Sequence, residues 1–120
     1  MNVAIIYKKN VKDRVLDDFV RELPVIMSDV LEVPGGKVAI LKPEQVSLEF
    51  TEANPRDIGE DIRIMIFARS NDPRTSSEHV LTQEILDKVV ALIAKSGEDC
   101  SVNVRLYLME VGKANHDPGK

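Results

Sequence analysis

The stretch IRIMIFARSNDPRTSSE, residues 62–78, passes from one structural pattern to another within a short length. In its first part isoleucine alternates with bulkier or charged side chains, a period of two that predicts a β-strand over 61–69. Turn-forming residues follow, and Thr75 and Glu78 have the spacing of a capping box, in which each side chain satisfies a free backbone amide at a helix start. The stretch therefore predicts a strand, a turn and a helix in succession.

The helix predicted after this turn continues through a long apolar, periodic segment. Its apolar positions recur at helical spacing, Lys95 falls in its last turn, and Gly97 readily takes the left-handed conformation that ends many helices. The alternation in SVNVRLYLME predicts a final strand over 101–110. The residues 112–120 then form a polar C-terminal tail, so that a single folded domain would span 1–111.

The first half of the chain repeats this plan. The apolar run VAIIY predicts a buried strand over 3–7, and Asn10 is placed to cap the helix that follows. Pro24 lies inside that helix, and because proline lacks an amide hydrogen we expect a kink or a break near Leu23. The segment PGGKVAIL, residues 34–41, begins with turn residues that end the helix, and the remainder would either lengthen the approach to the second strand or form an extra edge strand.

Together the two halves predict an α+β domain made of two consecutive β-α-β units, the second strand being VSLEFTEA at 46–53. Strands joined through a helix would be parallel, and right-handed crossovers would place both helices on one face of a four-stranded mixed sheet. The other face would be apolar, which indicates a protein partner. Its members would include Met65, Phe67, Tyr107 and Met109.

The connection between the two units leaves two arrangements open. Residues 54–60 are long for a minimal hairpin and would reach across the first strand. Hairpin loops of this length also exist, and a hairpin here would give a ferredoxin-like α+β fold instead. The strand order therefore decides between them.

Composition excludes several functions. The formal net charge is −4, from 16 basic and 20 acidic residues, and there is no Trp, which together disfavour nucleic-acid binding. No segment is apolar over the length needed to span a bilayer, so no membrane association is expected. Cys100 is the single cysteine, which fits a reducing, cytoplasmic location. His79 and His116 have no metal-ligand spacing, so we expect no metal and no cofactor.

With these features the chain resembles the tautomerase superfamily, whose members include macrophage migration inhibitory factor, 4-oxalocrotonate tautomerase and the cis-3-chloroacrylic acid dehalogenases. The resemblance is carried by the duplicated unit, the strand endings FTEA and LMEV, the segment KPEQV, and the stretch IFARSNDPRTSSE. It implies a homotrimer in which sheets face one another, which would cover the apolar face. It also implies a small carboxylate or carbonyl ligand and keto-enol proton transfer.

The chain departs from the superfamily at its first residues. Family enzymes expose a proline whose secondary amine, in an apolar pocket, acts as general base or nucleophile. Here Asn2 follows Met1, and initiator methionine is normally removed only before a small side chain, so we expect Met1 to remain. Met1 and Asn2 would then occupy the catalytic position with a flexible primary amine, and the activity would be weak, altered or absent.

Three cationic residues are candidates for holding a carboxylate. Lys42, in KPEQV, matches a substrate-contacting lysine of migration inhibitory factor, and Lys37 competes for the same alignment position. Arg69 and Arg74 flank the turn after the third strand. Dehalogenase-like relatives bind a carboxylate at this turn through paired hydrogen bonds from arginine. The resemblance therefore implies a substrate-binding role for Arg69 and a catalytic role for Arg74. The competing interpretation is that all three are solvated surface cations.

Arg105 and Tyr107 form a further candidate pair on the final strand. Their spacing of two places them on one face of it, and they match pocket-lining positions in migration inhibitory factor. Arg105 would bind substrate and Tyr107 would donate to a developing enolate, whereas the plainer interpretation of Tyr107 is a packing residue with a solvated hydroxyl. A tautomerase-like enzyme, a ferredoxin-like binding module and a trimeric scaffold without catalysis therefore remain as hypotheses.

Overall fold

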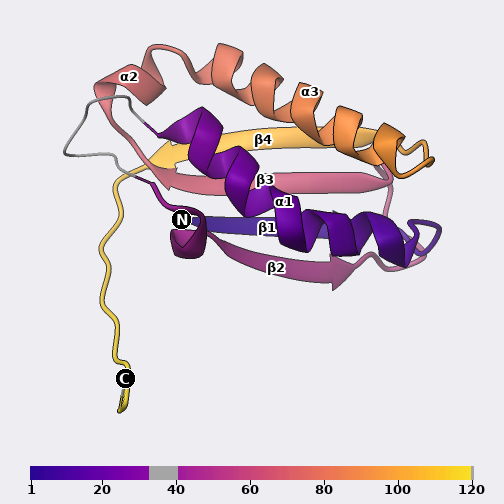
Figure 1. The fold of residues 1–120 in the computed structure, drawn as a ribbon, viewed down its shortest axis with the longest axis horizontal. Coiled ribbons are helices and arrows are strands. Elements are labelled where there is room, and N and C mark those ends of the chain that lie inside the picture. Colours follow the sequence, from indigo (N-terminus) through magenta and orange to yellow (C-terminus); the bar gives the residue numbers. More distant parts are fainter. Residues whose placement is uncertain (33–40, 120) are drawn as a thin grey trace.

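A computed structural model of the chain describes residues 1–32 and 41–119. It contains one sheet of four strands in the order β2-β1-β3-β4 (Figure 1). The extra edge strand expected in 34–41 falls almost entirely outside the described residues, as does Lys37. The strands are β1 (Asn2–Tyr7), β2 (Ser47–Glu52), β3 (Ile62–Arg69) and β4 (Val102–Met109).

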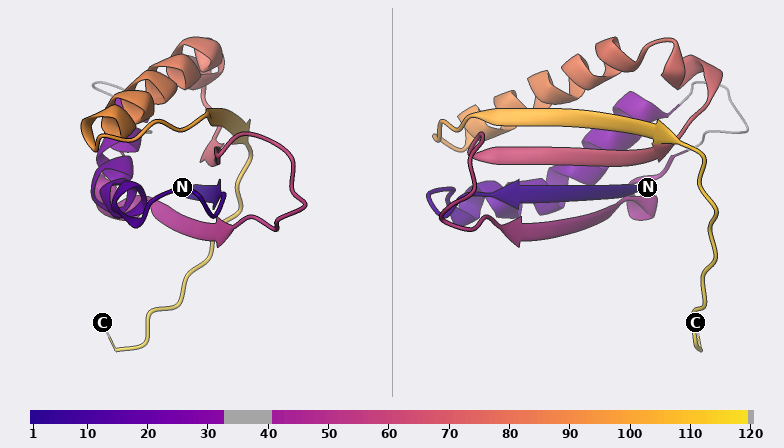
Figure 2. Two further views of the ribbon diagram at one scale, coloured as in Figure 1. Left: turned by 90° about the vertical axis from the view of Figure 1, so that its right-hand side faces the viewer. Right: turned by 180° about the vertical axis from the view of Figure 1, so that it is seen from behind.

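Strand direction confirms two β-α-β units. β1 is parallel to β2, β3 is parallel to β4, and the two units meet through the antiparallel pair β1 and β3. Because β1 lies between β2 and β3, the connection 54–60 crosses β1 and is no hairpin, and the ferredoxin-like alternative is wrong. The connection projects from the side of the sheet opposite the helices (Figure 2).

Both long helices cover one face of the sheet, as predicted (Figure 2). α1 follows β1, and α3 follows β3 after the single turn α2; a short 3-10 helix, η1, precedes β2. The fold is therefore the expected α+β arrangement of a mixed four-stranded sheet and two helices on one face. The helical elements are α1 (Asp13–Leu31), η1 (Pro43–Gln45), α2 (Asp72–Thr75) and α3 (Glu78–Lys95).

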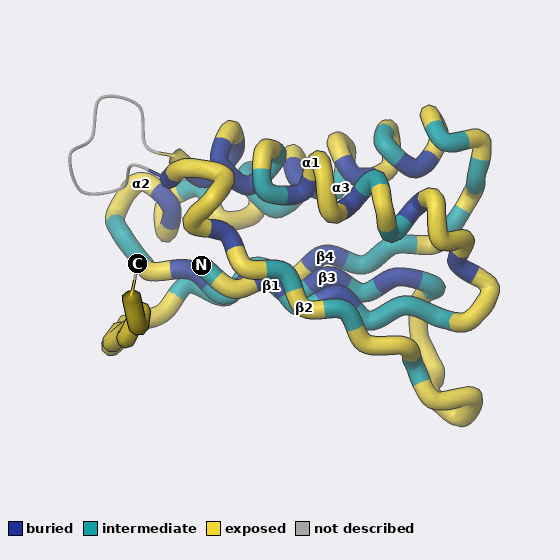
Figure 3. Tube along the Cα trace, turned by 60° about the horizontal axis from the view of Figure 1, so that its bottom comes forward, coloured by how far each residue is buried: buried dark blue, intermediate teal, exposed yellow. Residues whose placement is uncertain are grey.

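The hydrophobic core lies between the sheet and these helices (Figure 3). On β3 every second residue is fully buried, and the side chains between them are half-buried on the other face, which is the half-covered pattern of a sheet with helices on one side. Phe19, Leu23 and Met27 on α1 are likewise inaccessible. The buried side chains of α1, which recur at helical spacing, and those of β3, which alternate along the strand, therefore belong to one core.

Helix α1 differs from the sequence prediction at its start and in its middle. Its N-cap residue is Lys12 rather than Asn10, whose side-chain amide instead donates to Asp61 Oδ1 at 3.5 Å. The helix runs through Pro24 without a break. Pro24 lacks the amide hydrogen that would bond to the carbonyl of Val20, an exposed residue, while Leu23 stays buried in the core.

The turn before α3 is built differently from the predicted capping box. The side chain of Asn71 accepts a hydrogen bond from the Arg74 amide at 2.9 Å and so caps α2. Ser77 precedes α3 and makes no side-chain cap, so the pairing of Thr75 with Glu78 is wrong. Thr75 is the last residue of the short helix α2, whereas the sequence pattern alone placed it at the start of α3.

The C-terminal end of α3 confirms the role predicted for Gly97. Gly97 has a φ of 81°, and its amide donates to the carbonyl of Ala94 at 3.0 Å. The amide of Glu98 donates to the carbonyl of Ile93 at 3.3 Å. These two bonds form a Schellman motif, which satisfies carbonyls that the helix itself leaves free.

The face of the sheet away from the helices, here called the open face, is covered by neither long helix (Figure 2). Register places Ala4, Met65 and Arg105 in one row across β1, β3 and β4, and Asn2, Phe67 and Tyr107 in the next. The residues beyond Met109 lead away from the body of the molecule (Figure 1). No helix in the described ranges has the length and apolarity to cross a membrane.

Candidate functional site

The amine of Met1 is held at the amino end of β1 by η1. It donates to the main-chain oxygen of Gln45 at 3.3 Å, and the Met1 carbonyl accepts from the amide of Ser47 at 2.9 Å. The Gln45 side chain in turn accepts from the amide of Lys42 at 2.9 Å. The Met1 side chain packs on the core. The amine is therefore anchored, where a flexible one was expected.

The surroundings of the Met1 amine disfavour its protonated form. Partial burial is the main cause of a lowered pKa, and the positive charges of Lys113 and Arg74 lower it further. An unperturbed α-amine has a pKa of about 7.7–8.0, so this lowering brings more of the neutral, proton-accepting form to neutral pH. Nearby cations also attract an anion to the same place.

Arg74 is almost wholly buried, at 6% exposure, and it connects two elements. Its Nε donates to the carbonyl of Leu31, at the end of α1, at 3.0 Å, and its Nη1 donates to the carbonyl of Arg69, at the end of β3, at 2.9 Å. Burial lowers its pKa, yet a guanidinium remains charged at neutral pH. Arg74 thus fixes a positive charge near Met1 while it pins α1 to β3.

The two other cations predicted at this end of the sheet are exposed. Lys42 stands at the start of η1, and its amide, not its ammonium, makes the contact that orders the turn. Arg69 ends β3 and donates from Nη2 to the carbonyl of Val111 at 3.3 Å. That bond ties the C-terminal segment, and with it the region of Lys113, back to the end of β3.

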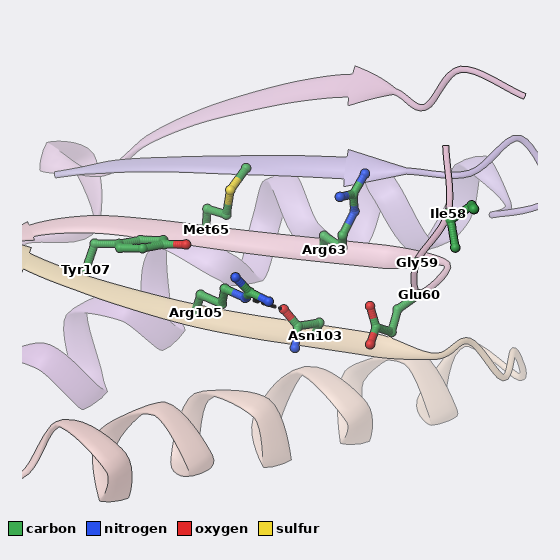
Figure 4. Close-up of a pocket in the computed structure, with 8 residues that line it drawn as sticks. All are labelled: Ile58, Gly59, Glu60, Arg63, Met65, Asn103, Arg105 and Tyr107. Atoms are coloured by element: carbon green, nitrogen blue, oxygen red, sulfur yellow. Dashed lines mark hydrogen bonds between the residues drawn. The ribbon is translucent and has the colours of Figure 1, made fainter. Parts of the chain in front are cut away.

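Arg105 and Tyr107 lie on β4, which is separated from β1 by β3. They line a hollow of about 210 Å³ on the open face, here called the arginine pocket (Figure 4). Arg105 Nε donates to Asn103 Oδ1 at 3.2 Å. The structure therefore gathers Met1, Asn2 and Arg74 at the amino end of β1 and leaves Arg105 in a separate place. The pocket is lined by Ile58, Gly59, Glu60, Arg63, Met65, Asn103, Arg105 and Tyr107.

A second hollow of about 370 Å³ lies beside Asn2 on the same face. Phe67 lines this hollow, Tyr107 lines the arginine pocket, and the two rings stack with centroids 5.1 Å apart. The stacked pair is thus a common wall between the two hollows. The other residues lining the second hollow are Val3, Ala4, Ser47, Leu48 and Glu49.

Sequence reasoning did not single out Arg63, Asn103 or Glu60. Arg63 alternates with buried isoleucines on β3, and this alternation already assigned it to the open face. Its proximity to Asn103 follows only from the parallel register of β3 and β4, which pairs the two residues. Glu60 and Gly59 join them because the connection from β2 crosses to this side.

The remaining reactive groups of the described chain offer no alternative centre. Burial raises the pKa of the Cys100 thiol, and the charges of Asp61, Glu98 and Asp99 raise it further, so the thiol is protonated and poorly nucleophilic at neutral pH. Among residues 1–32 and 41–119 no His, Cys, Asp and Glu side chains group as metal ligands.

The sequence matches no protein-family model and no curated protein. Solved structures do match. A malonate semialdehyde decarboxylase inhibited by 3-bromopropiolate superposes with a TM-score of 0.68 at 12% identity, covering 100% of this chain and 92% of that one. A fused 4-OT protein, whose wild type is an asymmetric trimer, gives a TM-score of 0.66 at 11% identity over 97% of this chain and 94% of its own.

A third similar structure extends the same picture. The macrophage migration inhibitory factor-like protein of Entamoeba histolytica gives a TM-score of 0.61 at 12% identity, covering 97% of this chain and 94% of that one. The superposition extends over nearly all of each chain. The chain therefore has the fold of the tautomerase superfamily, as the sequence resemblance indicated, and identities this low establish the fold and nothing finer.

Proposed function

We propose that the protein is a tautomerase-like homotrimer that binds a small carboxylate or carbonyl compound at the amino end of β1. Met1 supplies its α-amine as the proton-transfer group, and Asn2 lines the adjoining hollow. Arg74 provides fixed positive charge, and Lys42 and Arg69 are the exposed cations of the same end of the sheet. Arg105 and Tyr107 belong to the neighbouring pocket on the open face.

The observation that carries this proposal is the position of the Met1 amine, which is anchored to the carbonyl of Gln45 at 3.3 Å, partly buried and near two cations, so that its pKa is lowered. A neutral amine can take a proton from the carbon next to a carbonyl, which leaves an enolate and an ammonium. The positive charges of Arg74 and Lys113 stabilise the enolate oxygen as its charge develops. The ammonium then gives the proton to the enolate oxygen, which converts the keto form to the enol. The same steps in reverse take the proton from the enol oxygen and deliver it to the carbon, which converts the enol to the keto form.

The trimer is supported by the open face and by the structural neighbours. Half-buried apolar side chains, with Met65, Phe67 and Tyr107 among them, lie on a face that no helix covers. A face of this character indicates a protein contact, and a fused 4-OT protein of the same fold is a trimer. A cyclic trimer of identical chains would bury all three copies of this face.

The direct test is ketonisation of phenylenolpyruvate by the purified protein, with mass spectrometry establishing which residue carries the free amine. The matched comparison is the same chain with its α-amine acetylated, which removes the base and leaves every side chain in place. Turnover that disappears on acetylation supports the proposal. Turnover that survives acetylation refutes Met1 as the base.

A scaffold without catalysis is the second candidate, and the primary amine at Met1 in place of a proline is the observation that favours it. Sedimentation of the unmodified protein separates the candidates. A stable trimer without turnover over a series of enzyme concentrations identifies a scaffold. Arg74→Ala is a poor control for catalysis, because loss of its two main-chain contacts would disturb the fold.

A further inference from the structure

We propose that copies of this chain join edge to edge, with Glu49 on β2 of one copy forming an ion pair with Arg105 on β4 of the next. This inference rests on the homotrimer proposed above, and it adds which edges of the sheet meet and which residues select that contact. The register of the sheet, the exposure of the two side chains and the spread of charge over the open face support it.

Glu49 and Arg105 lie in one row of the open face, at its two opposite edges. Glu49 is the partner of Ala4 on β1, and Ala4 is in turn the partner of Met65 on β3. Met65 is the partner of Arg105 on β4. The row therefore begins with an anion and ends with a cation, and their backbones are three strand spacings, roughly 14 Å, apart within one copy.

Side-chain alternation on β2 directs Glu49 to the open face. Leu48 and Phe50 pack against the core, so Glu49 between them faces away from the helices. Glu49 accordingly lines the hollow that Phe67 also lines, and Arg105 lines the arginine pocket on the same face (Figure 4). Both charges are therefore available to a molecule that covers this face.

Both side chains are exposed, and neither has an ionic partner within the described chain. The ion pairs formed by residues 1–32 and 41–119 involve Arg14, Arg21 and His79 instead. Arg105 donates through Nε to Asn103 Oδ1 at 3.2 Å, which leaves its Nη groups for a carboxylate. Complementary charges of this kind determine which surfaces meet more than they add affinity.

Rotational symmetry brings the two ends of this row together. β2 is parallel to β1, β1 is antiparallel to β3, and β3 is parallel to β4, so the two edge strands run in opposite directions. A rotation about an axis along the strands keeps every row at its own level. The β2 edge of one copy then meets the β4 edge of the next, and Glu49 meets Arg105 at each contact of a closed ring.

The neighbouring rows are compatible with the same contact. One row ends in Ser47 and Tyr107, and the other ends in Thr51 and Asn103. These side chains carry hydroxyl and amide groups, which both donate and accept hydrogen bonds. An apolar centre with a polar rim is typical of a protein interface. Apart from Arg63, the middle of these rows is occupied by Asn2, Ala4, Ile6, Met65 and Phe67.

The test is charge exchange, measured by sedimentation velocity over a series of protein concentrations. Glu49→Arg and Arg105→Glu each place like charges at all three contacts of the ring. Each should raise the constant for dissociation into single copies by about a hundredfold, which is about fivefold for each contact. The double variant restores opposite charges in exchanged positions and keeps the net charge of −4, and it should assemble as the unmodified protein does.

Two further variants control for charge alone. Glu52→Arg changes the net charge as Glu49→Arg does, on the same strand but with the side chain on its other face. Lys88→Glu changes it as Arg105→Glu does, at an exposed position of α3. Neither control should alter the dissociation constant. Circular dichroism confirms that each variant is folded before its assembly is compared.

Mixing the two single variants reports how many copies form the ring. Unlike variants attract at either contact, because arginine then meets glutamate. A ring of three retains one contact between two copies of the same variant, whereas a ring of two or four alternates and retains none. The mixture should therefore assemble less tightly than the double variant. Equally tight assembly would refute a ring of three and still support the pairing of Glu49 with Arg105.

A chemical cross-link locates the contact directly. Arg105→Lys keeps the positive charge and supplies an amine that a carbodiimide couples to the Glu49 carboxylate, the reagent taking up the elements of water as the amide forms. With a mixture of 15N-labelled and unlabelled chains, peptide mass spectrometry should find this amide between copies. Its absence from a cross-linked trimer overturns the contact.

Other results also overturn the proposal. A trimer that both single variants leave intact overturns the pairing but not the trimer itself. A double variant that stays as weak as the single ones overturns the pairing, as does equal weakening by Glu52→Arg or Lys88→Glu. An unmodified protein that remains a single copy at every concentration overturns the trimer and this contact together.

Discussion

The ring of Phe67 stacks on the ring of Tyr107, with planes 11° from parallel and centroids 5.1 Å apart. The two residues are opposite each other on parallel strands β3 and β4. An aromatic pair of this kind contributes about 0.5–1.5 kcal/mol beyond the area that it buries. Here the pair also separates two hollows, so its loss would merge them.

Tyr107→Ala is therefore expected to lower the free energy of unfolding by about 1 kcal/mol or more, since the stack and its buried area are lost. Tyr107→Phe retains the stack and should unfold at nearly the same urea concentration as the unmodified protein. Urea denaturation followed by circular dichroism measures both, at one fixed protein concentration because assembly shifts the midpoint. Equal midpoints for Ala and Phe would show that the stack contributes nothing.

Arg74→Met is expected to destabilise the fold strongly. The variant fills similar space but leaves the carbonyls of Leu31 and Arg69 without these donors. The contact with Leu31 is buried, and its unpaired carbonyl alone should cost about 1–3 kcal/mol. Arg56→Met, in the exposed connection before β3, is the control and should change stability by less than about 0.5 kcal/mol. Urea midpoints that do not differ between the two variants would contradict a pinning role.

The lowered pKa of the Met1 amine predicts its pattern of chemical labelling. An amine-selective acylating reagent should modify Met1 with an apparent pKa below the ordinary value of about 7.7–8.0. Lys113→Gln removes one of the charges that lower this pKa and should raise it, as should added salt. Peptide mass spectrometry over a pH series measures it, and an unshifted value in Lys113→Gln would exclude the charge contribution.

The same pKa sets the sign of a pH effect on stability. The folded protein binds fewer protons at this amine than the unfolded chain does, so stability rises as the pH increases from the folded pKa to the unfolded pKa. This gain in the free energy of unfolding is complete above the pKa of the amine in the unfolded chain, and it is absent below the pKa of the amine in the folded protein. Acetylation of the amine should remove this component from unfolding midpoints measured between pH 6 and about 9, where an α-amine titrates.

Asp61 predicts a pH dependence of the same sign, but in the acid range where a carboxyl group titrates. Its carboxylate accepts from the amide of Ser101 at 3.1 Å and from the side chain of Asn10 at 3.5 Å, and the Ser101 hydrogen bond is the main reason that its pKa is lowered. The stabilisation is present above the unfolded pKa and is lost as the pH falls through the folded pKa. The difference in urea midpoint between the protein and Asp61→Asn should therefore shrink from neutral pH toward acid. A difference that stays constant with pH would contradict the assignment.

Gly97→Ala tests the end of α3. A β-carbon there would meet nothing within 4 Å, so the cost comes only from holding alanine at a φ of 81°, about 1–2 kcal/mol. Gly112→Ala also adds a methyl group to open space, without a positive φ, and should be close to neutral. Thermal unfolding compares the two, and similar effects would show that backbone conformation at Gly97 is not the cause.

Local patterns in the sequence were sufficient for the elements but not for their ends. The alternation on β3 and the helical spacing of Phe19, Leu23 and Met27 depend on burial within one element, and both predict the core correctly. Asn10 and Thr75 were misassigned as caps because short-range motifs compete. The side chain of Asn10 donates to Asp61, which precedes β3, and does not cap α1. Asn71 caps the short helix α2, which lies before α3 and includes Thr75.

The candidate site depended on long-range geometry that one sequence does not contain. That Arg74 reaches the ends of α1 and β3 follows only from the packed arrangement of the two units. Arg63 was on the correct face by alternation, yet its neighbours on β4 and in the crossing connection are set by strand order. The sequence pattern was sufficient to assign each charged residue to a strand or a helix. The order of the strands determines which of these residues line the same pocket.

The antiparallel contact of β1 with β3 makes the molecule two like modules joined at their first strands. Residues 54–60 are exposed and satisfy part of their own hydrogen bonding, as the amide of Arg56 donates to Asn54 Oδ1 at 2.9 Å. The covalent link between the modules therefore acts mainly by keeping them close together, and it contributes few contacts of its own. If the link were cut, the two fragments would have to associate from solution in order to fold. A gene that encodes one such module would need only duplication and a linker to reach this architecture.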